Sequence, residues 1–381
     1  MTAKTKKEYS KAVAERYLNA KGRKEKTKIL DEFCATLRYS RKYAIQKLRN
    51  INFHDPAGGR SREKLYSAES DALLMEIWRY FGCICAERLH PFLSEAIRIL
   101  EKFGYIEMTD ALKKELLTMS RPTVGRRIAD HKKRFGGGRG LSATRPGSLL
   151  KRHIPVQTKS WDMTKPGFLE MDLVAHCGGS LSGDFINTLQ MVDILTTWTE
   201  RRAVMGKSQG AVFAGILDIE KKLPFTVLGY DSDNGSEFIN DQLWKYCSDR
   251  GIVFTRSRPY MKKDNAHIEQ KNWPLVRKVL GYDRFDTQHQ LMLINDLYDN
   301  ELRLYLNFFQ PSLKLVSKER FGAKVRRKYN GAKTPYQRVL ECPEVEEHKK
   351  AELRLLYETL DPVKLKRKID EKIRIIISLV R

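Results

Sequence analysis

The first 130 or so residues place hydrophobic side chains at helical spacing and show few strand-like alternations. Tyr9, Val13 and Tyr17 recur at every fourth position, and a second apolar stripe runs through residues 29–37. Ser40 then stands where an N-cap belongs, before a short segment whose apolar side is surrounded by Arg and Lys. Three helices with a basic third one are typical of a helix-turn-helix, whose last helix enters the major groove of DNA. A small helical bundle with a solvated basic face is the alternative.

A second helical unit is predicted over residues 65–135, after a basic linker rich in Pro and Gly. It ends in a basic segment with Ser120 placed as a cap and Pro122 in the first helical turn. The first unit, residues 1–52, likewise consists of several predicted helices that end in a capped basic one, so two DNA-binding units in series are expected. Residues 136–158 are rich in Gly, Ser and basic residues, which predicts a linker or an arm lying along DNA phosphates.

Strand and helix patterns alternate between residues 159 and 290, which we expect to form one α/β domain with a mixed sheet. The predicted order is three strands, a helix, a strand, a helix, a strand and a helix, over residues 168–174, 185–192, 199–204, 211–222, 227–231, 241–250, 252–256 and 265–280. Residues 291–381 begin with a helical pattern and become very basic. The final KIRIIISLVR is strand-like, so a small, basic, β-rich C-terminal domain is expected.

The charge balance points to a polyanionic partner. The chain has 71 Lys and Arg against 47 Asp and Glu, a net charge of +24 and a pI near 9.7. Such an excess repels itself, and contacts with phosphates release condensed counterions. Nucleic acid is therefore the expected partner; a solvated surface, or a ribosome-associated or membrane-surface protein, is the alternative. No apolar run is long enough to span a membrane, and six scattered cysteines predict a reduced, cytoplasmic setting rather than a disulfide framework.

Three acidic residues interrupt apolar or turn sequences. Asp172 lies within an otherwise apolar strand, Asp233 opens an Asp-Asn-Gly turn after a strand, and Glu269 lies one turn into a predicted helix. Burying a carboxylate costs several kcal/mol unless it is paired or holds a metal, so converging carboxylates indicate divalent cations. Mg²⁺ takes oxygen ligands and keeps waters, and two such ions about 4 Å apart can clamp the attacking and leaving oxygens at phosphorus.

The spacing of these acids carries a family resemblance. Sixty residues separate Asp172 from Asp233 and 35 separate Asp233 from Glu269, within the segments EMDLV, SDNGSEF, RPY and DNAHIEQKN. In these residues the chain resembles the integrase-core transposases of bacterial insertion sequences, relatives of retroviral integrases with a ribonuclease-H-like fold. The retroviral His-His-Cys-Cys zinc module has no counterpart here, and Pro274 predicts a kink or an end in the helix that carries Glu269.

The resemblance implies Asp172, Asp233 and Glu269 as catalytic ligands of two Mg²⁺ or Mn²⁺ ions. It implies metal-dependent cleavage at transposon ends and strand transfer by the freed 3′-hydroxyl into target DNA, by a homo-oligomer assembled on double-stranded DNA in the bacterial cytoplasm with the nucleoid. Two alternatives are a DNA-binding regulator that has lost activity and a ribonuclease-H-like nuclease that cuts without joining. The expected DNA contacts are Arg41, Lys42, Lys47, Arg126, Arg127 and Asn265, of which Asn265 is equally well placed to cap its helix.

Several neighbours compete for roles in this site. Asp231 lies two residues before Asp233 and is the rival second ligand, although the motif favours Asp233. Glu237 is expected to be a solvated turn residue, with a role behind the metal ligands as the alternative. Asp193 is expected to be a sheet-edge polar residue, and His176 to serve loop packing or to approach the site. Gly206-Lys207-Ser208 resembles the end of a phosphate-binding loop, but the leading glycine of that motif is absent.

Overall fold

The computed structural model spans the chain and describes residues 1–50, 65–134, 164–233, 235–256, 276–321 and 324–380. The chain divides into two compact units, Met1–Leu65 and Tyr66–Arg381, and each is described by itself. Within the described ranges, no helix is both long enough and apolar enough to cross a membrane.

The first unit is a three-helix domain made of α1 (Ala3–Asn19), α2 (Arg23–Leu37) and α3 (Arg41–Arg49). The apolar stripes seen in the sequence form its core, with Phe33, Ala44 and Leu48 fully buried. Arg38 ends α2 in the left-handed conformation, at a φ of 54°, and the hydroxyl of Ser40 caps α3 by accepting a hydrogen bond from the N–H of Tyr43 at 3.4 Å. The helix that begins at Arg41 and its Ser40 cap are therefore as the sequence indicates.

The second unit opens with four helices: α4 (Ala68–Tyr80), α5 (Ala86–Lys102), α6 (Asp110–Thr118) and α7 (Arg121–Arg134). Their buried side chains belong to the same hydrophobic cluster as those of the C-terminal helices, such as Phe308 and Val363. The chain near residue 81 is tied to this region, because Tyr305 donates to the carbonyl of Tyr80 and Gln310 donates to that of Phe81, each at 3.0 Å. The helices of residues 66–134 therefore share a core with the C-terminal part of the chain.

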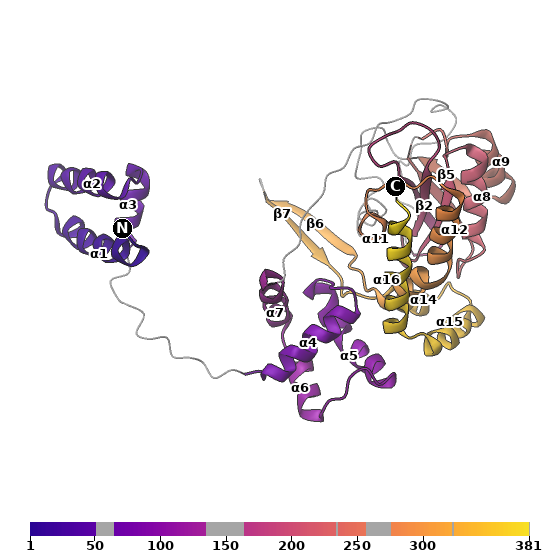
Figure 1. The fold of residues 1–381 in the computed structure, drawn as a ribbon, viewed down its shortest axis with the longest axis horizontal. Helices are drawn as coiled ribbons and strands as arrows, with labels where there is room; N and C mark the ends of the chain where they lie inside the picture. Colours follow the sequence, from indigo (N-terminus) through magenta and orange to yellow (C-terminus); the bar gives the residue numbers. More distant parts are fainter. Residues whose placement is uncertain (51–64, 135–163, 234, 257–275, 322–323, 381) are drawn as a thin grey trace. The chain divides into compact units, whose positions relative to one another are not determined.

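A five-stranded mixed sheet forms the centre of the second unit (Figure 1). Its strands are β1 (Phe168–Ala175), β2 (Ile186–Asp193), β3 (Thr199–Met205), β4 (Gly229–Ser232) and β5 (Val253–Arg256), in the order β3-β2-β1-β4-β5. The first three strands are antiparallel, whereas β4 and β5 run parallel to β1. Helices α8 (Gln209–Glu220) and α9 (Asp241–Arg250) pack against the sheet. Their buried side chains form one hydrophobic cluster with sheet residues such as Leu169, Met171 and Tyr230. The predicted mixed sheet is confirmed.

The C-terminal region is mostly helical, which corrects the expected β-rich end. It contains α11 (Lys278–Leu280), α12 (Gln288–Leu297), the π-helical turn η2 (Tyr298–Leu302), α13 (Arg303–Phe309), the hairpin strands β6 (Leu315–Phe321) and β7 (Lys324–Tyr329), α14 (Pro335–Glu341), α15 (Glu347–Thr359) and α16 (Pro362–Ser378). The strand-like KIRIIISLVR is largely the last part of α16, which Asp361 caps through the N–H groups of Val363 and Lys364. Ile369 and Ile376, seven residues apart, are buried on one side of α16. In the sequence the apolar residues around Ile376 form a short run, which is also typical of a strand.

Two asparagines cover the open edge of the sheet at β3. The side-chain amide of Asn307 bonds both the N–H and the C=O of Thr199, each at 2.9 Å. Asn295 does the same at Ala203, at 2.8 Å to the N–H and 3.0 Å to the carbonyl. Because an edge strand otherwise presents unpaired backbone groups, α12 and α13 take the place of a sixth strand.

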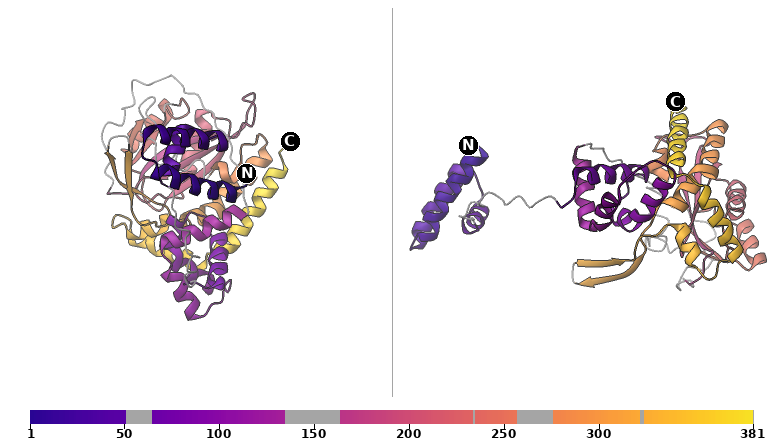
Figure 2. Two further views of the ribbon diagram at one scale, coloured as in Figure 1. Left: turned by 90° about the vertical axis from the view of Figure 1, so that its left-hand side faces the viewer. Right: turned by 90° about the horizontal axis from the view of Figure 1, so that it is seen from below.

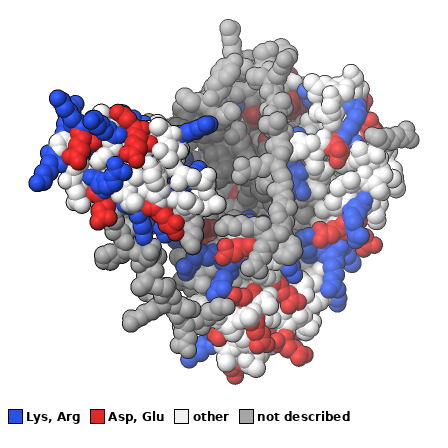
Figure 3. Space-filling model, turned by 60° about the vertical axis from the view of Figure 1, so that its left-hand side comes forward, with Lys and Arg blue, Asp and Glu red and all other residues white. Residues whose placement is uncertain are grey.

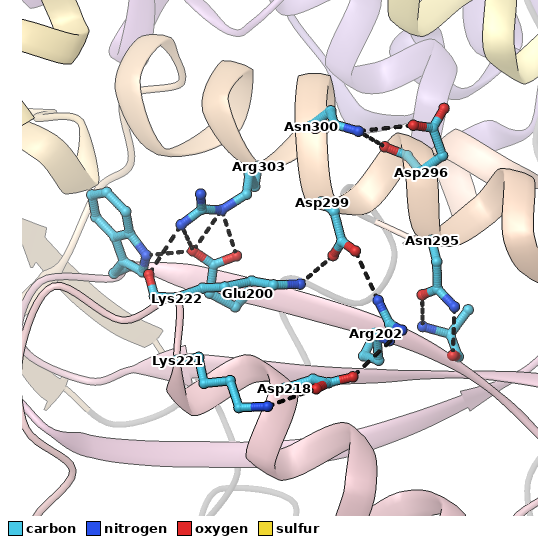
Figure 4. A network of polar contacts seen from close by, with 12 residues as sticks. Glu200, Arg202, Asp218, Lys221, Lys222, Asn295, Asp296, Asp299, Asn300 and Arg303 are labelled. Atoms are coloured by element: carbon cyan, nitrogen blue, oxygen red, sulfur yellow. Dashed lines mark hydrogen bonds and ion pairs between the residues drawn. The ribbon is translucent and has the colours of Figure 1, made fainter.

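Ion pairs extend this junction on the same strand (Figure 4). The buried carboxylate of Glu200 is 2.9 Å from the guanidinium of Arg303. Arg202 is 2.7 Å from Asp299, which also pairs with Lys222 at the end of α8. The C-terminal helices are thus joined to the β3 edge of the sheet by paired charges as well as by the two asparagine side chains.

Candidate active site

The site begins where the parallel ladder between β1 and β4 ends. The last paired residues are Met171 in β1 and Ser232 in β4. Asp172 is the next residue of β1, still paired with Gln190 of β2, and Asp233 is the first residue after β4. Since the two strands are parallel neighbours, both aspartates occupy the same end of the sheet.

The turn after β4 fixes the carboxylate of Asp233. Its Oδ1 accepts a hydrogen bond from the N–H of Gly235 at 2.9 Å. Burial raises the pKa of Asp233 above its ordinary value, while this N–H and the charge of Lys207 act in the opposite direction. A carboxylate held this way keeps its charge at a cost, which a bound cation would offset.

Glu237 also belongs to this site, contrary to the expectation of a solvated turn residue. It is partly buried, and its carboxyl group lies against Gly235, where an added Cβ would be 2.6 Å from the Glu237 Cδ. Burial raises the pKa of Glu237, and the charge of Asp233 raises it further. The absence of a side chain at Gly235 allows this approach, which residue-by-residue reading of the turn did not anticipate.

Lys207 is a cation at the rim of the site, in a segment whose incomplete phosphate-loop motif does not predict this role. It is exposed in the loop before α8, whose N-cap Ser208 accepts from the N–H of Ala211. Its charge lowers the pKa values of both Asp233 and Glu237, so the ammonium lies near both carboxylates. Gln209 donates to the carbonyl of Ser236 at 3.4 Å, which joins this loop to the turn after β4. No sequence signal links segments so distant along the chain.

Asp231, the rival second ligand, has a different environment. It lies inside the ladder, fully buried, in register with Glu170 of β1 and Thr255 of β5. Its Oδ1 accepts the hydroxyl of Thr255 at 2.6 Å. Asp231 is therefore a residue of the sheet interior, whereas Asp233 lies in the turn at its end.

Two other candidates serve the packing of loops. Asp193 is buried and accepts hydrogen bonds from the N–H of Gly167 at 2.7 Å and from the N–H and hydroxyl of Thr196 at 2.6 Å, so it holds the turn between β2 and β3. His176 is buried against the ring of Phe285, and its Nε2 is 2.8 Å from the hydroxyl of Thr188. Burial lowers the pKa of His176 to about 3, and the nearby charge of Arg277 acts in the same direction.

A buried arginine lies in the same cross-strand row as Asp172. The register aligns Asp172 with Gln190 and Gln190 with Arg201. Arg201 is 2% exposed and donates from Nε to Oε1 of Gln190 at 3.0 Å, and burial lowers its pKa to about 10. Its Nη2 has no hydrogen-bond partner among the residues that the structure describes. The sheet behind Asp172 thus carries a desolvated positive charge.

The third predicted ligand, Glu269, lies outside the described residues, as do Asn265 and Pro274. In the part of the chain that the structure covers, no three His, Cys, Asp or Glu side chains are grouped as a metal site. Of the predicted ligands, Asp172 and Asp233 lie within the described residues, and Glu237 lies close to Asp233. Carboxylate oxygens are the donors that Mg²⁺ and Mn²⁺ prefer, so this donor set fits a hard divalent cation.

The expected DNA-contact residues of α3 have partners of their own. Arg41 forms an ion pair with Asp31. Lys47 donates to the hydroxyl of Tyr39 at 3.2 Å and lies 4.7 Å from the centre of that ring. Lys42 is exposed. Residues 1–50 carry 15 Lys and Arg against 5 Asp and Glu, and Figure 3 shows these basic side chains on the lobe at its upper left, with acidic ones between them.

In α7, the two expected contacts are also engaged. Arg127 forms an ion pair with Asp71 of α4, and Arg126 donates to the hydroxyl of Thr123 at 3.3 Å. Arg127 therefore holds α7 against α4, so binding of DNA phosphate by Arg127 would have to compete with this contact. Their role in DNA contact stays a prediction.

The sheet order and the two aspartates at the ends of β1 and β4 are the framework of the candidate site. The chain is 36% identical over 335 residues to the uncharacterized protein y4rM of Sinorhizobium fredii (strain NBRC 101917 / NGR234), an alignment that covers 88% of this chain and 95% of that protein. The chain belongs to the same family as y4rM. No protein-family model matches it.

Among solved structures, the chain is similar to retroviral integrase cores. The catalytic core domain of BIV integrase is 21% identical, with 49% of this chain and 98% of that chain covered and a TM-score of 0.32. The HTLV-2 integrase catalytic core domain in complex with magnesium is 14% identical, with 39% and 90% covered and a TM-score of 0.29. These similarities cover less than half of this chain, and they are reported only as similarities.

Proposed function

We propose that this protein is a DNA transposase, a metal-dependent polynucleotidyl transferase whose catalytic ligands are Asp172, Asp233 and Glu269. The observation that carries the proposal is the placement of Asp172 and Asp233 at adjacent ends of two parallel strands. Their environment supports it, because Asp233 is held by a backbone N–H while burial opposes its charge. Asp231 is a weaker candidate, since its buried carboxylate already accepts the hydroxyl of Thr255.

Each part of the site has a proposed role in phosphoryl transfer. Asp172, Asp233 and Glu269 would hold two Mg²⁺ or Mn²⁺ ions, which supply electrostatic stabilisation of the attacking and leaving oxygens. Lys207 offers a positive charge at the rim for a DNA phosphate. No protein nucleophile is required: water would attack at the transposon end, and the freed 3′-hydroxyl would then form a new phosphodiester bond with target DNA while a target phosphodiester breaks.

The basic charge of the chain supports DNA as its partner. The first unit presents α3 after a short turn, and its excess of Lys and Arg would gain affinity for the phosphate backbone through counterion release. We propose that this unit binds the transposon ends. A homo-oligomer is proposed as well, because strand transfer requires two ends to be brought together.

A strand-transfer assay tests the function. The full chain is incubated with Mg²⁺, a target plasmid and labelled duplexes that carry the inverted repeats flanking its gene. We expect shortened ends and labelled ends joined to the plasmid. Shortened ends without joined product would indicate a nuclease, and bound but intact ends would indicate an inactive regulator.

The metal requirement is tested in the same assay. Mg²⁺ or Mn²⁺ should support both steps, because carboxylate ligands select hard cations. Ca²⁺ should allow DNA binding with little chemistry, since its larger and looser coordination shell disturbs a two-metal geometry. Full activity in excess chelator would overturn the mechanism.

A further inference from the structure

The β6–β7 hairpin projects from the second unit as a two-stranded arm (Figures 1 and 2). Its strands pair antiparallel from Leu315↔Tyr329 to Phe321↔Lys324, with an irregularity between Leu315 and Ser317. Seven residues of extended chain make a ribbon roughly 20 Å long. A two-stranded hairpin without further partners is marginally stable in water, so such an arm is expected to gain stability from a binding partner.

The base of the hairpin is firmly anchored. Ser312 and Lys333 exchange two backbone hydrogen bonds, at 2.9 and 3.2 Å. The ammonium of Lys314 donates to the carbonyl of Leu195 in the turn between β2 and β3, at 2.8 Å. Arg338 of α14 donates to the carbonyl of Ser312 at 2.6 Å. The arm therefore leaves the sheet domain in a defined direction.

Its charge is strongly one-sided. Residues 314–333 contain eight Lys and Arg and a single acid, Glu319. The exposed side chains include Arg326, Arg327 and Lys328 on β7. Three of these cations follow one another on β7, and like charges held this close together repel. A polyanion would remove this repulsion.

The arm and the start of α7 line one cavity of about 450 Å³. Arg327 and Lys328 reach it from β7, and Arg121 reaches it from the first residue of α7. Glu87 is the one acid among the lining residues that the structure describes. Cations from two elements far apart in the sequence thus share one concave surface.

We propose that the β6–β7 hairpin is a DNA-binding arm, which together with Arg121 of α7 binds the backbone of duplex DNA. The major groove admits a two-stranded β-ribbon, and the exposed cations of β7 would neutralise phosphates beside it. Exposed apolar side chains at the arm, with Val316 62% exposed and Tyr329 48% exposed, offer contact area for sugars and bases. That the partner of the hairpin is DNA rests on the proposed function. Binding of DNA by the hairpin can nevertheless be measured without catalysis.

Binding of the full chain to a duplex is measured by fluorescence anisotropy over a range of salt, in chelator so that no cleavage occurs. The triple variant R326Q/R327Q/K328Q should weaken binding at least tenfold near physiological salt. The slope of log K against log salt should become shallower by about three, at roughly 0.9 per lost phosphate contact. The matched control K221Q/K349Q/K364Q removes the same charge from α8, α15 and α16 and should change the slope by less than one.

A photocrosslinker at Val316 provides a second readout that does not depend on net charge. It should join the protein to DNA, whereas the same group at Leu355, exposed on α15, should not. Equal losses in the triple variant and its control, or no crosslink from residue 316, would overturn the proposal. The proposal would also be overturned if the triple variant bound DNA as the wild type does but no longer bound vesicles of anionic phospholipid. If the triple variant weakens DNA binding but the wild-type chain neither cuts nor joins DNA, the proposed transposase activity is wrong. The proposal that the hairpin binds DNA is then still supported.

Discussion

Asp172 and Asp233 each lie one residue beyond Met171 and Ser232, the pair that ends the parallel ladder between β1 and β4. This relationship follows from topology, because adjacent parallel strands bring their C-terminal ends to one edge of the sheet. It makes a shared role of the two carboxylates testable without knowledge of the third ligand. The turn that follows adds Glu237 and, through the loop before α8, Lys207.

Asp172→Asn and Asp233→Asn should each abolish end cleavage and strand transfer, because an amide keeps the shape but loses the charge that holds the metal. Combining them should cost no more than either alone, since residues that act as one unit fail together. The metal-free Asp233→Asn protein should melt at the same or a higher temperature, because burial opposes the Asp233 charge.

The control for these variants is Asp231→Asn. It alters a buried bond with Thr255, so some stability should be lost while substantial activity remains. Activity assays and thermal melts on the same preparations check both results. An inactive Asp231→Asn beside an active Asp233→Asn would shift the second ligand by two residues.

Lys207→Gln should separate DNA binding from metal binding. Removing its charge from the neighbourhood of Asp233 and Glu237 should raise the KM for DNA ends by up to about tenfold, or about 1.4 kcal/mol. The same change should lower the Mg²⁺ concentration for half-maximal activity, because a like charge near the metal is gone. Lys221→Gln, exposed at the end of α8, is the control and should change neither value. Parallel changes of both constants in one direction would count against a phosphate-binding role.

The sheet edge gives a prediction about stability. Asn307→Ala should lower the free energy of unfolding by about 1–3 kcal/mol, because the N–H and C=O of Thr199 lose their partner in a buried position. Asn295→Ala should act similarly at Ala203. Asn300→Ala, which removes only bonds to Asp296 at the surface, should cost far less. Urea unfolding compares the three, and equal losses would show that the edge is not held by these amides.

The sequence allowed the succession of strands and helices over residues 168–256 to be predicted, because the patterns that indicate them are local. Asp241–Arg250 is a helix with the bounds that its cap and spacing indicate. KIRIIISLVR was predicted as a strand because a short apolar run looks the same in both structures, and only packing of Ile369 and Ile376 decides between them. For Glu237 the sequence left a solvated position and a role behind the metal ligands open, and for Lys207 it indicated no role in the site, because the proximity of both to Asp233 is a matter of tertiary structure.

His176 predicts how stability depends on pH. Burial lowers its pKa to about 3 in the folded chain, whereas an unfolded histidine titrates near 6.5. Between these values the unfolded state binds more protons, so the free energy of unfolding should fall as pH is lowered through 6.5. The expected loss is about 1.4 kcal/mol per pH unit, or about 2 kcal/mol between pH 6.5 and 5.

His176→Gln removes this titration and can still bond to the hydroxyl of Thr188, so its unfolding free energy should be flatter over this pH range than that of the wild type. His348→Gln, which alters an exposed histidine on α15, should keep the wild-type slope. Urea unfolding at pH 7.5, 6 and 5 measures all three proteins. If His176→Gln loses stability with acid as steeply as the wild type, then His176 binds its proton equally in the folded and the unfolded chain. The buried, neutral imidazole that packs the end of β1 against Phe285 would then have to be abandoned.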